Sequence, residues 1–169
     1  MKLAETERLD FIEATADDIE EIMELEVDPE NRDFIWQGSF EQHLSEIEDP
    51  NHLLLVFVDN KSGSHKGYTL CRIDRKSNVF ELRRIAISDK GKGYGREAMK
   101  GIIKYAFEQL GTNRLWLDVY PDNFKGISLY ESLGMHRDGI LRQNYLAERG
   151  YLDQIIYSLL RSEYDELFK

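Results

Sequence analysis

A glycine-rich segment that carries three cations, residues 90–96, has the residue types needed to bind a ligand. It reads Lys90-Gly91-Lys92-Gly93-Tyr94-Gly95-Arg96. Glycines let backbone N–H groups approach a ligand closely, and the start of the helix predicted after them adds partial positive charge. The three cations gather here although the chain has 22 Lys and Arg against 32 Asp and Glu, a net charge of −10. The segment predicts a phosphate or pyrophosphate site; the alternative is a flexible turn with solvated lysines.

A second segment, residues 123–135, places an asparagine and a tyrosine on one predicted helix. Its sequence is Asn123-Phe124-Lys125-Gly126-Ile127-Ser128-Leu129-Tyr130-Glu131-Ser132-Leu133-Gly134-Met135. Seven residues are nearly two helical turns, so Asn123 and Tyr130 would share roughly one face, about 10 Å apart along the axis. The tyrosine could protonate a leaving group while the asparagine orients an extended ligand. The alternative is an N-cap asparagine and a packing tyrosine.

The glycine segment also matches a dinucleotide-binding fingerprint, which gives a competing interpretation. Gly93, Gly95 and Ala98 fit G-x-G-x-x-A, and Asp118 follows where a ribose-binding acid could sit. The Walker A pattern is absent. The position of the fingerprint argues against a dinucleotide fold, because three strands of antiparallel type precede it and only about half of the chain follows.

The order of predicted elements indicates one mixed α/β (α+β) domain with a central sheet. Apolar runs and alternation predict strands at residues 8–14, 52–59, 67–73, 79–88, 115–120, 139–146 and 153–160. Helical spacing predicts helices that begin near residues 15, 39, 95 and 123, the third with apolar positions up to Leu110. The unit over residues 79–120 is predicted to be a right-handed parallel crossover. A short polar tail ends the chain.

Composition excludes several classes of protein. The negative charge opposes binding to nucleic acid, and an aromatic content of 11% is too high for a disordered chain. No apolar segment is long enough to span a membrane, since the longest apolar run, residues 53–58, has six residues. One cysteine, Cys71, and four scattered histidines predict a reducing, cytoplasmic setting and no metal site.

The two motifs together resemble those of the GNAT superfamily of acetyl-CoA-dependent N-acetyltransferases. The family's phosphate loop, R/Q-x-x-G-x-G/A, corresponds to residues 90–95, and its later segment, N-x-x-A-x-x-L-Y-x-x-x-G-F/M, corresponds to residues 123–135 with Gly126 in place of Ala. Residues 114–119 and 139–142 look most like the RimJ/RimL-type branch. The resemblance implies a single domain over residues 1–169. It also implies a mostly antiparallel sheet of about six to seven strands, flanked by about four helices.

The resemblance implies a role for each motif. Acetyl-CoA would be the cosubstrate, and a primary amine would attack its thioester directly, without an acyl-enzyme. The pantetheine arm would run beside Ile85, Ala86 and Ile87, where a backbone donor polarises the thioester carbonyl. The pyrophosphate would rest on the loop and helix start, at Lys90, Gly91, Lys92, Gly93, Tyr94, Gly95 and Arg96. Asn123 would hold the pantetheine or a water, and Tyr130 would protonate the leaving thiolate.

Glu81 is the candidate base for deprotonating the amine, with an ordered water as the alternative. Strand alternation puts Glu81, Arg83, Ile85 and Ile87 on one face, provided that no bulge intervenes. The competing interpretation of Glu81 is an ion pair with Arg83, Arg84 or a neighbouring lysine. Cys71 could carry an acetyl group in principle, but a small buried side chain in a plain strand fits it better.

The acceptor is expected between residues 29–40 and the hairpin around residues 143–151, where Asp33, Trp36 and Tyr145 could receive a cation. Trp36 could instead fold into the core. The acidic balance favours a polyamine, a small amine or a basic protein N-terminus. The rivals are a dinucleotide-dependent oxidoreductase and a non-catalytic acyl-CoA-binding module. A homodimer through the C-terminal strands would be ordinary for this fold.

Overall fold

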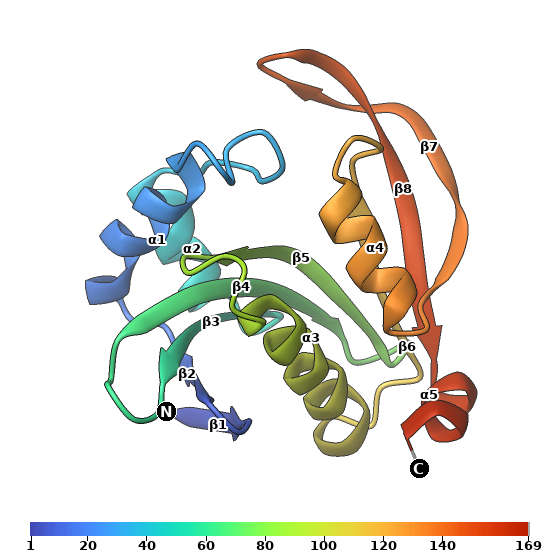
Figure 1. The fold of residues 1–169 in the computed structure, drawn as a ribbon, viewed down its shortest axis with the longest axis horizontal. Helices are drawn as coiled ribbons and strands as arrows, with labels where there is room; N and C mark the ends of the chain where they lie inside the picture. The colour runs from blue at the N-terminus through green and yellow to red at the C-terminus, as the bar shows by residue number, and fades with distance from the viewer. Residues whose placement is uncertain (169) are drawn as a thin grey trace.

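One eight-stranded sheet organises the protein, whose computed structural model describes residues 1–168 (Figure 1). Its spatial order is β1-β2-β3-β4-β5-β6-β8-β7. Only β5 and β6 pair in parallel, as expected for the crossover through α3, and every other pair is antiparallel. The strands are β1 (Lys2–Glu5), β2 (Leu9–Glu13), β3 (His52–Asp59), β4 (His65–Asp74), β5 (Val79–Ile87), β6 (Arg114–Val119), β7 (His136–Ala147) and β8 (Gly150–Leu160).

Five α-helices within residues 1–168 cover the sheet, and short turns add to two of them. They are α1 (Ile19–Val27), α2 (Phe40–Glu48), α3 (Tyr94–Lys104), α4 (Phe124–Ser132) and α5 (Arg161–Phe168). A 3₁₀ turn, η1 (Ala16–Asp18), leads into α1, and a π-helical turn, η2 (Tyr105–Gln109), continues α3. Ser39 caps α2 through a capping box with Gln42, as its sequence spacing predicts.

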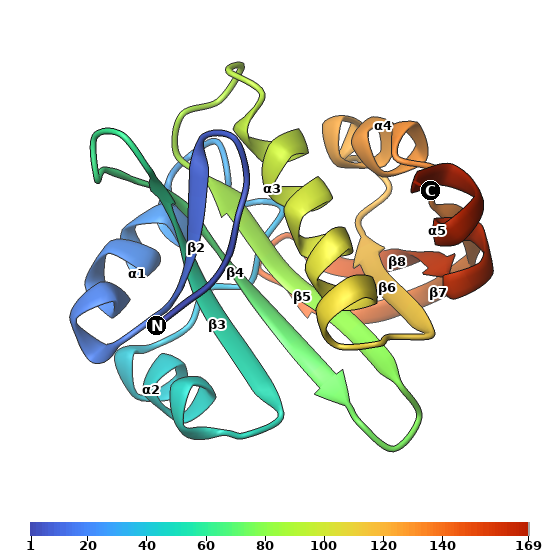
Figure 2. The same cartoon turned by 90° about the horizontal axis from the view of Figure 1, so that it is seen from below.

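The two faces of the sheet carry different helices and different cores (Figures 1 and 2). On one face α3 and α4 bury the larger core, which includes Met99, Phe107 and Tyr130. On the other face α1 and α2 cover a smaller core around Ile22, Tyr68 and Leu70. Two-sided burial explains why β3 reads as a continuous apolar run.

The parallel pair at the centre of the sheet opens into a wedge. Val79–Glu81 of β5 pair with Arg114–Trp116 of β6, and there the pairing ends. Beyond that point β6 pairs with β8 along residues 114–119, while β5 stays with β4. The two strands therefore diverge, and their free edges face each other across an opening.

The long β7–β8 hairpin rises beyond the sheet and arches toward the connection between α1 and α2 (Figure 1). Its pairing is interrupted between Leu141 and Tyr145, where Gln143 adopts a positive φ of 48°. The arch brings the hairpin tip to a segment that lies more than a hundred residues earlier in the chain. No helix in the described part of the chain is long and apolar enough to cross a bilayer.

The fold class and the antiparallel majority are confirmed, and three details were predicted wrongly. The sheet has eight strands because β1, unpredicted, pairs with β2, and the fifth α-helix is the tail after residue 160. Tyr164 of that helix stacks on Phe107 at 4.7 Å between ring centroids, so the polar tail has an apolar anchor. Leu110 is 37% exposed, because the π turn adds one residue and rotates it off the buried face.

Candidate active site

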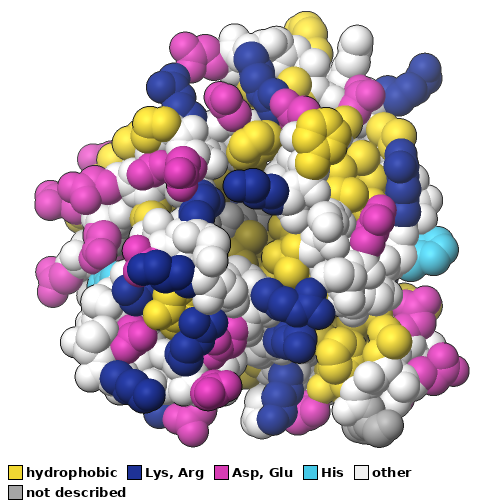
Figure 3. Space-filling view, in the orientation of Figure 1, with side chains coloured by type: hydrophobic (Ala, Val, Ile, Leu, Met, Phe, Trp, Pro, Cys, Tyr) yellow, Lys and Arg dark blue, Asp and Glu magenta, His cyan; other side chains and the backbone are white. Residues whose placement is uncertain are grey.

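A single cavity of about 1140 Å³ follows the wedge between β5 and β6 and joins the two sequence motifs. It runs from the glycine loop, past β5 and α4, to the segment between α1 and α2. Figure 3 shows the hollow in the middle of the face drawn, with hydrophobic side chains inside it and Lys and Arg side chains around its rim. Of the residues proposed from sequence it collects Trp36, Glu81, Ile85, Ala86, Ile87, Lys90, Gly91, Gly93, Tyr94, Gly95, Asn123, Tyr130 and Tyr145.

The glycine loop presents backbone donors to one end of this cavity. Gly91 and Gly93 have φ angles of 77° and 80°, in the left-handed region that glycine adopts without strain. Gly93 is the N-cap of α3. Within residues 1–168, no backbone N–H from Gly91 to Arg96 reaches a protein acceptor. These free donors at a helix N-terminus suit a phosphate group.

Of the three cations of the loop, two lie outside the cavity, which differs from the prediction that all three contact the ligand. Lys90 lines the cavity, but its Nζ donates to Oδ1 of Asn31 at 2.6 Å. Lys92 and Arg96 lie outside the lining of the cavity. Lys92 faces Asp89 at 3.8 Å, and Arg96 donates to the Ser132 hydroxyl at 2.6 Å beside a shallow groove next to α4. Of the three cations, Lys90 is therefore the one that lines the cavity.

The free edge of β5 supplies two further donors. Ser88 N–H points to Lys66 of β4, so strand alternation turns the N–H groups of Ile87 and Ile85 toward the wedge. The N–H of Ala86 points to β4 on the same grounds. Among the three residues proposed for the pantetheine arm, Ile85 and Ile87 thus offer amides, and Ala86 contributes only lining.

Asn123 and Tyr130 both line the cavity from α4, as their spacing predicts. Oδ1 of Asn123 accepts from Gly126 N–H at 3.0 Å, so the side chain caps the helix while Nδ2 stays available as a donor. A Cβ at residue 126 would lie 2.8 Å from Nδ2, so a residue larger than glycine there would shift the Asn123 side chain. Tyr130 is buried, and burial, with a smaller effect of Asp118, raises its pKa to about 12.

The predicted facing of Glu81 is wrong because β5 contains a bulge. Leu70 and Cys71 of β4 pair with Arg84 and Leu82, which leaves Arg83 as the extra residue. Glu81 consequently shares a face with Arg84, while Ile85 and Ile87 pack against the opposite core. Glu81 nonetheless lines the cavity, with Arg83 Nε at 3.4 Å from its Oε1. The ion pair was one of the alternatives left open by the sequence.

Asp118 also lines the cavity, although the sequence suggested it only as a ribose-binding acid. It lies on β6 between the buried Leu117 and Val119, and Gln154 donates to its Oδ1 at 3.1 Å. Burial, followed by the nearby charge of Glu81, raises the pKa of Asp118. An acid that interrupts an apolar strand was the signal available in the sequence.

The end of the cavity where the acceptor is expected, called the acceptor end below, combines aromatic side chains from distant segments. Trp36 lines the cavity rather than the core, and Tyr145 stacks on Tyr120 at 5.9 Å between ring centroids. Asp33 does not line the cavity; its carbonyl accepts from Arg149 at 2.8 Å. Of the three proposed acceptor residues, Trp36 and Tyr145 are therefore brought together and Asp33 stays outside.

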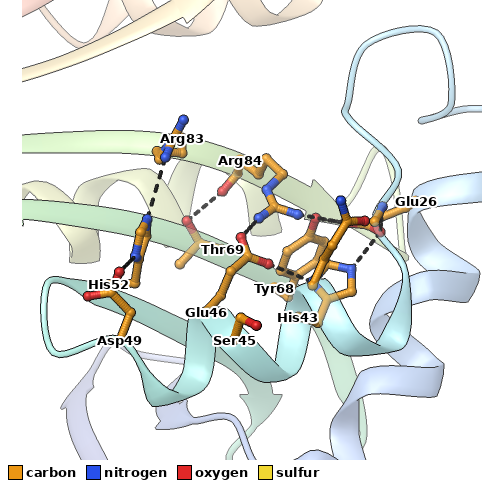
Figure 4. Close-up of polar contacts among 12 residues, drawn as sticks. Glu26, His43, Ser45, Glu46, Asp49, His52, Tyr68, Thr69, Arg83 and Arg84 are labelled. Carbon is orange, nitrogen blue, oxygen red and sulfur yellow. Dashed lines mark hydrogen bonds and ion pairs between the residues drawn. The ribbon is translucent and has the colours of Figure 1, made fainter.

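A polar network of Glu26, His43, Glu46, Tyr68 and Arg84 links α1, α2 and the sheet (Figure 4). Oε1 of Glu26 faces Nε2 of His43 at 2.9 Å, and Oε2 accepts from Tyr68 and, at 3.3 Å, from Arg84. Arg84 also contacts Glu46, which faces Nδ1 of His43 at 2.9 Å. Burial alone would raise the pKa of Glu26, but the hydrogen bonds from His43, Tyr68 and Gly38 N–H lower it below its ordinary value.

The network reaches the cavity through Arg84, whose guanidinium lies 4.4 Å from the ring centroid of Trp36. It thereby ties α1, α2, β4 and β5 to the wall of the acceptor end. The sequence did not predict this network, because Glu26, His43 and Arg84 come from elements that meet only in the folded sheet.

Comparison with known proteins assigns the family. The chain belongs to the acetyltransferase (GNAT) family, whose sequence model matches residues 13–135. The uncharacterized N-acetyltransferase p20 of Bacillus licheniformis is 38% identical over 74 residues, 44% of this chain and 42% of that protein. The putative ribosomal N-acetyltransferase YdaF of Bacillus subtilis is 30% identical over 111 residues, 66% of this chain and 60% of that protein. The chain thus spans about half the length of the curated relatives it matches.

Solved structures agree on the fold. A mutant of the spermidine N-acetyltransferase SpeG from Vibrio cholerae has a TM-score of 0.81 and 23% identity, over 94% of this chain and 97% of that chain. At this identity the likeness concerns the fold. The mostly antiparallel sheet is also unlike the parallel sheet of a dinucleotide-binding fold, so the oxidoreductase interpretation loses its structural basis.

Proposed function

We propose that the chain is a single-domain enzyme that transfers the acetyl group of acetyl-CoA directly to a primary amine. The observation that supports this most is one cavity that joins free amides at a helix N-terminus to the buried Tyr130 and the carboxylates of Glu81 and Asp118. The resemblance to the RimJ/RimL-type branch belongs to the same proposal.

The chain's own residues fit acetyl-CoA. The unpaired N–H groups from Gly91 to Arg96 suit its pyrophosphate, and the free amides of Ile85 and Ile87 suit its extended arm. Acetyl-CoA supplies the activated acetyl thioester. The lining of the cavity within residues 1–168 contains no cysteine, serine or histidine, which favours direct transfer. Cys71 is buried elsewhere, and burial raises the pKa of its thiol to about 12.

Two carboxylates are candidates for accepting the proton of the amine. Asp118 has a raised pKa, which brings it closer to that of a base that works near neutral pH, while Glu81 is held by Arg83. We infer that Asp118 accepts the proton, directly or through a water, and that Glu81 stabilises the cationic amine. Tyr130 donates its proton to the leaving thiolate, for which a pKa of about 12 keeps the hydroxyl protonated.

A primary amine fits the acceptor end because carboxylates and aromatic rings together favour a cation. The proteins whose sequences match part of this chain include a spermidine N(1)-acetyltransferase of Vibrio cholerae and a ribosomal protein bS18 alanine N-acetyltransferase of Salmonella typhimurium. A polyamine, a small amine and a protein N-terminus are accordingly the acceptor classes proposed, with no nucleic-acid partner. A homodimer in the cytoplasm belongs to the proposal as well.

The test is turnover of an amine panel with detection of released CoA thiol. Tyr130→Phe should lower kcat by about tenfold or more at neutral pH, because the leaving thiolate loses its acid. Tyr157→Phe is the matched control: its ring lies 6.4 Å from that of Tyr130, but its hydroxyl donates to Glu131 and does not line the cavity. An equal kcat in both variants would remove Tyr130 from the mechanism.

The pH dependence of kcat/KM separates the two carboxylates. Asp118→Asn should abolish the acidic limb of the profile, whereas Glu81→Gln should raise KM for the amine and keep the limb. The reverse result would return the base to Glu81. Acetyl-CoA binding without turnover of any amine would favour a non-catalytic module, and absence of binding would overturn the assignment of the glycine loop.

A further inference from the structure

One arginine at the tip of the β7–β8 hairpin bridges the acceptor end of the cavity. Arg149 makes a two-pronged ion pair with Asp122, with Nη2 at 3.2 Å from Oδ1 and Nη1 against Oδ2. Its Nη2 also donates to the carbonyl of Asp33 at 2.8 Å. A single guanidinium therefore holds together the hairpin, the segment after β6 and the segment between α1 and α2, which are distant in sequence.

The surroundings of this guanidinium form a cation site. Its central carbon lies 5.9 Å from the ring centroid of Phe34 and 5.7 Å from that of Tyr120. Two aromatic faces, a carboxylate and a carbonyl are the groups that bind an organic cation. Phe34, Tyr120 and Asp122 all line the cavity, whereas Arg149 does not. The chain's own cation thus occupies a site whose walls belong to the acceptor end.

Tyr120 connects this site to the proposed reaction centre. It follows β6 directly after Val119, so it lies two residues beyond Asp118. Its pKa is raised by burial and by Tyr145, then by Asp118, while Arg149 opposes the shift, so both charges act on the same hydroxyl. Asp118, Tyr120 and Asp122 all line the same cavity, so the site around Arg149 and the proposed reaction centre share one wall.

We propose that Arg149 is a specificity-determining residue that fills a distal cation site, so that the enzyme accepts amines with one ammonium group and disfavours diamines and polyamines. This inference rests on the proposed function and narrows its acceptor to monoamines. A second ammonium group would have to displace Arg149 from Asp122 or lie beside the guanidinium. In the second case the two positive charges would repel each other. Removing the guanidinium leaves Asp122 without this partner and vacates the position beside the rings of Phe34 and Tyr120.

The experiment compares n-butylamine with 1,4-diaminobutane at saturating acetyl-CoA. Arg149→Ala should raise the ratio of kcat/KM for the diamine over that for the monoamine at least about tenfold. Arg142→Ala is the matched control, because Arg142 is exposed on the same hairpin and has no ion pair within residues 1–168; its ratio should equal that of the wild type. In the double variant Arg149→Ala/Asp122→Asn the gain should vanish.

Other results would overturn the proposal. If Arg149→Ala lowers both acceptors equally, the residue is only a structural bridge, and a gain that survives in the double variant would show that Asp122 is not the site. Calorimetric binding of 1,4-diaminobutane separates this question from the proposed function. If no amine is turned over, the transferase proposal fails; tighter diamine binding by Arg149→Ala, at least about tenfold, would still support the distal site, and unchanged affinity would reject it.

Discussion

The proposed phosphate end of the cavity comes from one continuous segment, residues 85–96, whereas the proposed acceptor end collects side chains from several separate segments. At the phosphate end the donors are backbone N–H groups of β5, the glycine loop and the start of α3. At the end proposed for the acceptor, the groups that line the cavity are side chains such as Trp36, Asp118 and Tyr145. The first end depends on local conformation and the second on long-range contacts.

This difference has a consequence for variation of function. A site made of backbone amides tolerates changes in most side chains but few in the glycines that set its shape. A site made of side chains on separate elements can change its ligand through single substitutions. We therefore expect substitutions at the two ends to affect acetyl-CoA and the amine independently.

The largest effect is expected from Arg84→Met at the acceptor end. The substitution leaves Glu26 and Glu46 without their shared cation in a buried network, which should lower the free energy of unfolding by about 3–5 kcal/mol. In the variant that remains folded, KM for the amine should rise because Trp36 loses its support, while the Kd for acetyl-CoA stays unchanged. Urea unfolding and calorimetry measure the two quantities.

Arg83→Met is the matched control for this substitution. Arg83 is the adjacent residue, its side chain is 44% exposed, and its ion pair with Glu81 is of the kind that contributes at most about 1 kcal/mol. Equal destabilisation by Arg84→Met and Arg83→Met would show that the buried network does not stabilise the acceptor end. A weaker affinity of Arg84→Met for acetyl-CoA would show that the two ends are coupled.

A smaller effect is expected from Gly93→Ala at the phosphate end. A non-glycine residue at a φ of 80° costs about 1–2 kcal/mol, and the added Cβ would meet only Arg8 Nη2, at 3.4 Å. The strain should change the loop and weaken acetyl-CoA several-fold while leaving KM for the amine unchanged. Thermal unfolding and acetyl-CoA titration provide the measurements.

Gly63→Ala separates strain from binding. Gly63 has a φ of 75° in the β3–β4 turn, a Cβ added there would meet nothing within 4 Å, and the residue is remote from the cavity lining. It should lose comparable stability and keep its affinity for acetyl-CoA. If both variants bind acetyl-CoA as the wild type does, the loop amides do not hold the pyrophosphate.

The conformation of the proposed phosphate end could be predicted because its determinants are adjacent in sequence. Gly91, Gly93 and the helix that follows lie between two recognisable apolar elements, and the spacing of Asn123 and Tyr130 fixes their common helix face. The capping box at Ser39 is local in the same sense. Each of these inferences uses a periodicity or a turn preference that holds before any tertiary contact forms.

The acceptor end was not predictable to the same depth, because pairing and packing decide it. One extra residue at Arg83 turns Glu81 to the other face, and no pattern in the strand reveals whether the ladder will absorb it. Arg149 meets Asp122 only because the hairpin arches over the cavity. The partners of Arg84 come from α1, α2 and β4.

The smallest effect on stability is expected from Asp118→Asn, and this effect depends on pH. Because burial raises the pKa of Asp118 in the folded state, ionising it costs stability, and this cost grows as pH rises from the ordinary carboxyl pKa through the raised one. The asparagine can still accept from Gln154 and carries no charge. Asp118→Asn should therefore be more stable than the wild type at pH 7, with the difference shrinking toward zero below about pH 4. Asp122→Asn should show the opposite sign at pH 7, because Arg149 lowers the pKa of Asp122 and stabilises its charged form. Urea unfolding of the three proteins at pH 7 and below about pH 4 measures these differences. If the wild type is more stable than Asp118→Asn at pH 7, other groups in the cavity stabilise the charged carboxylate.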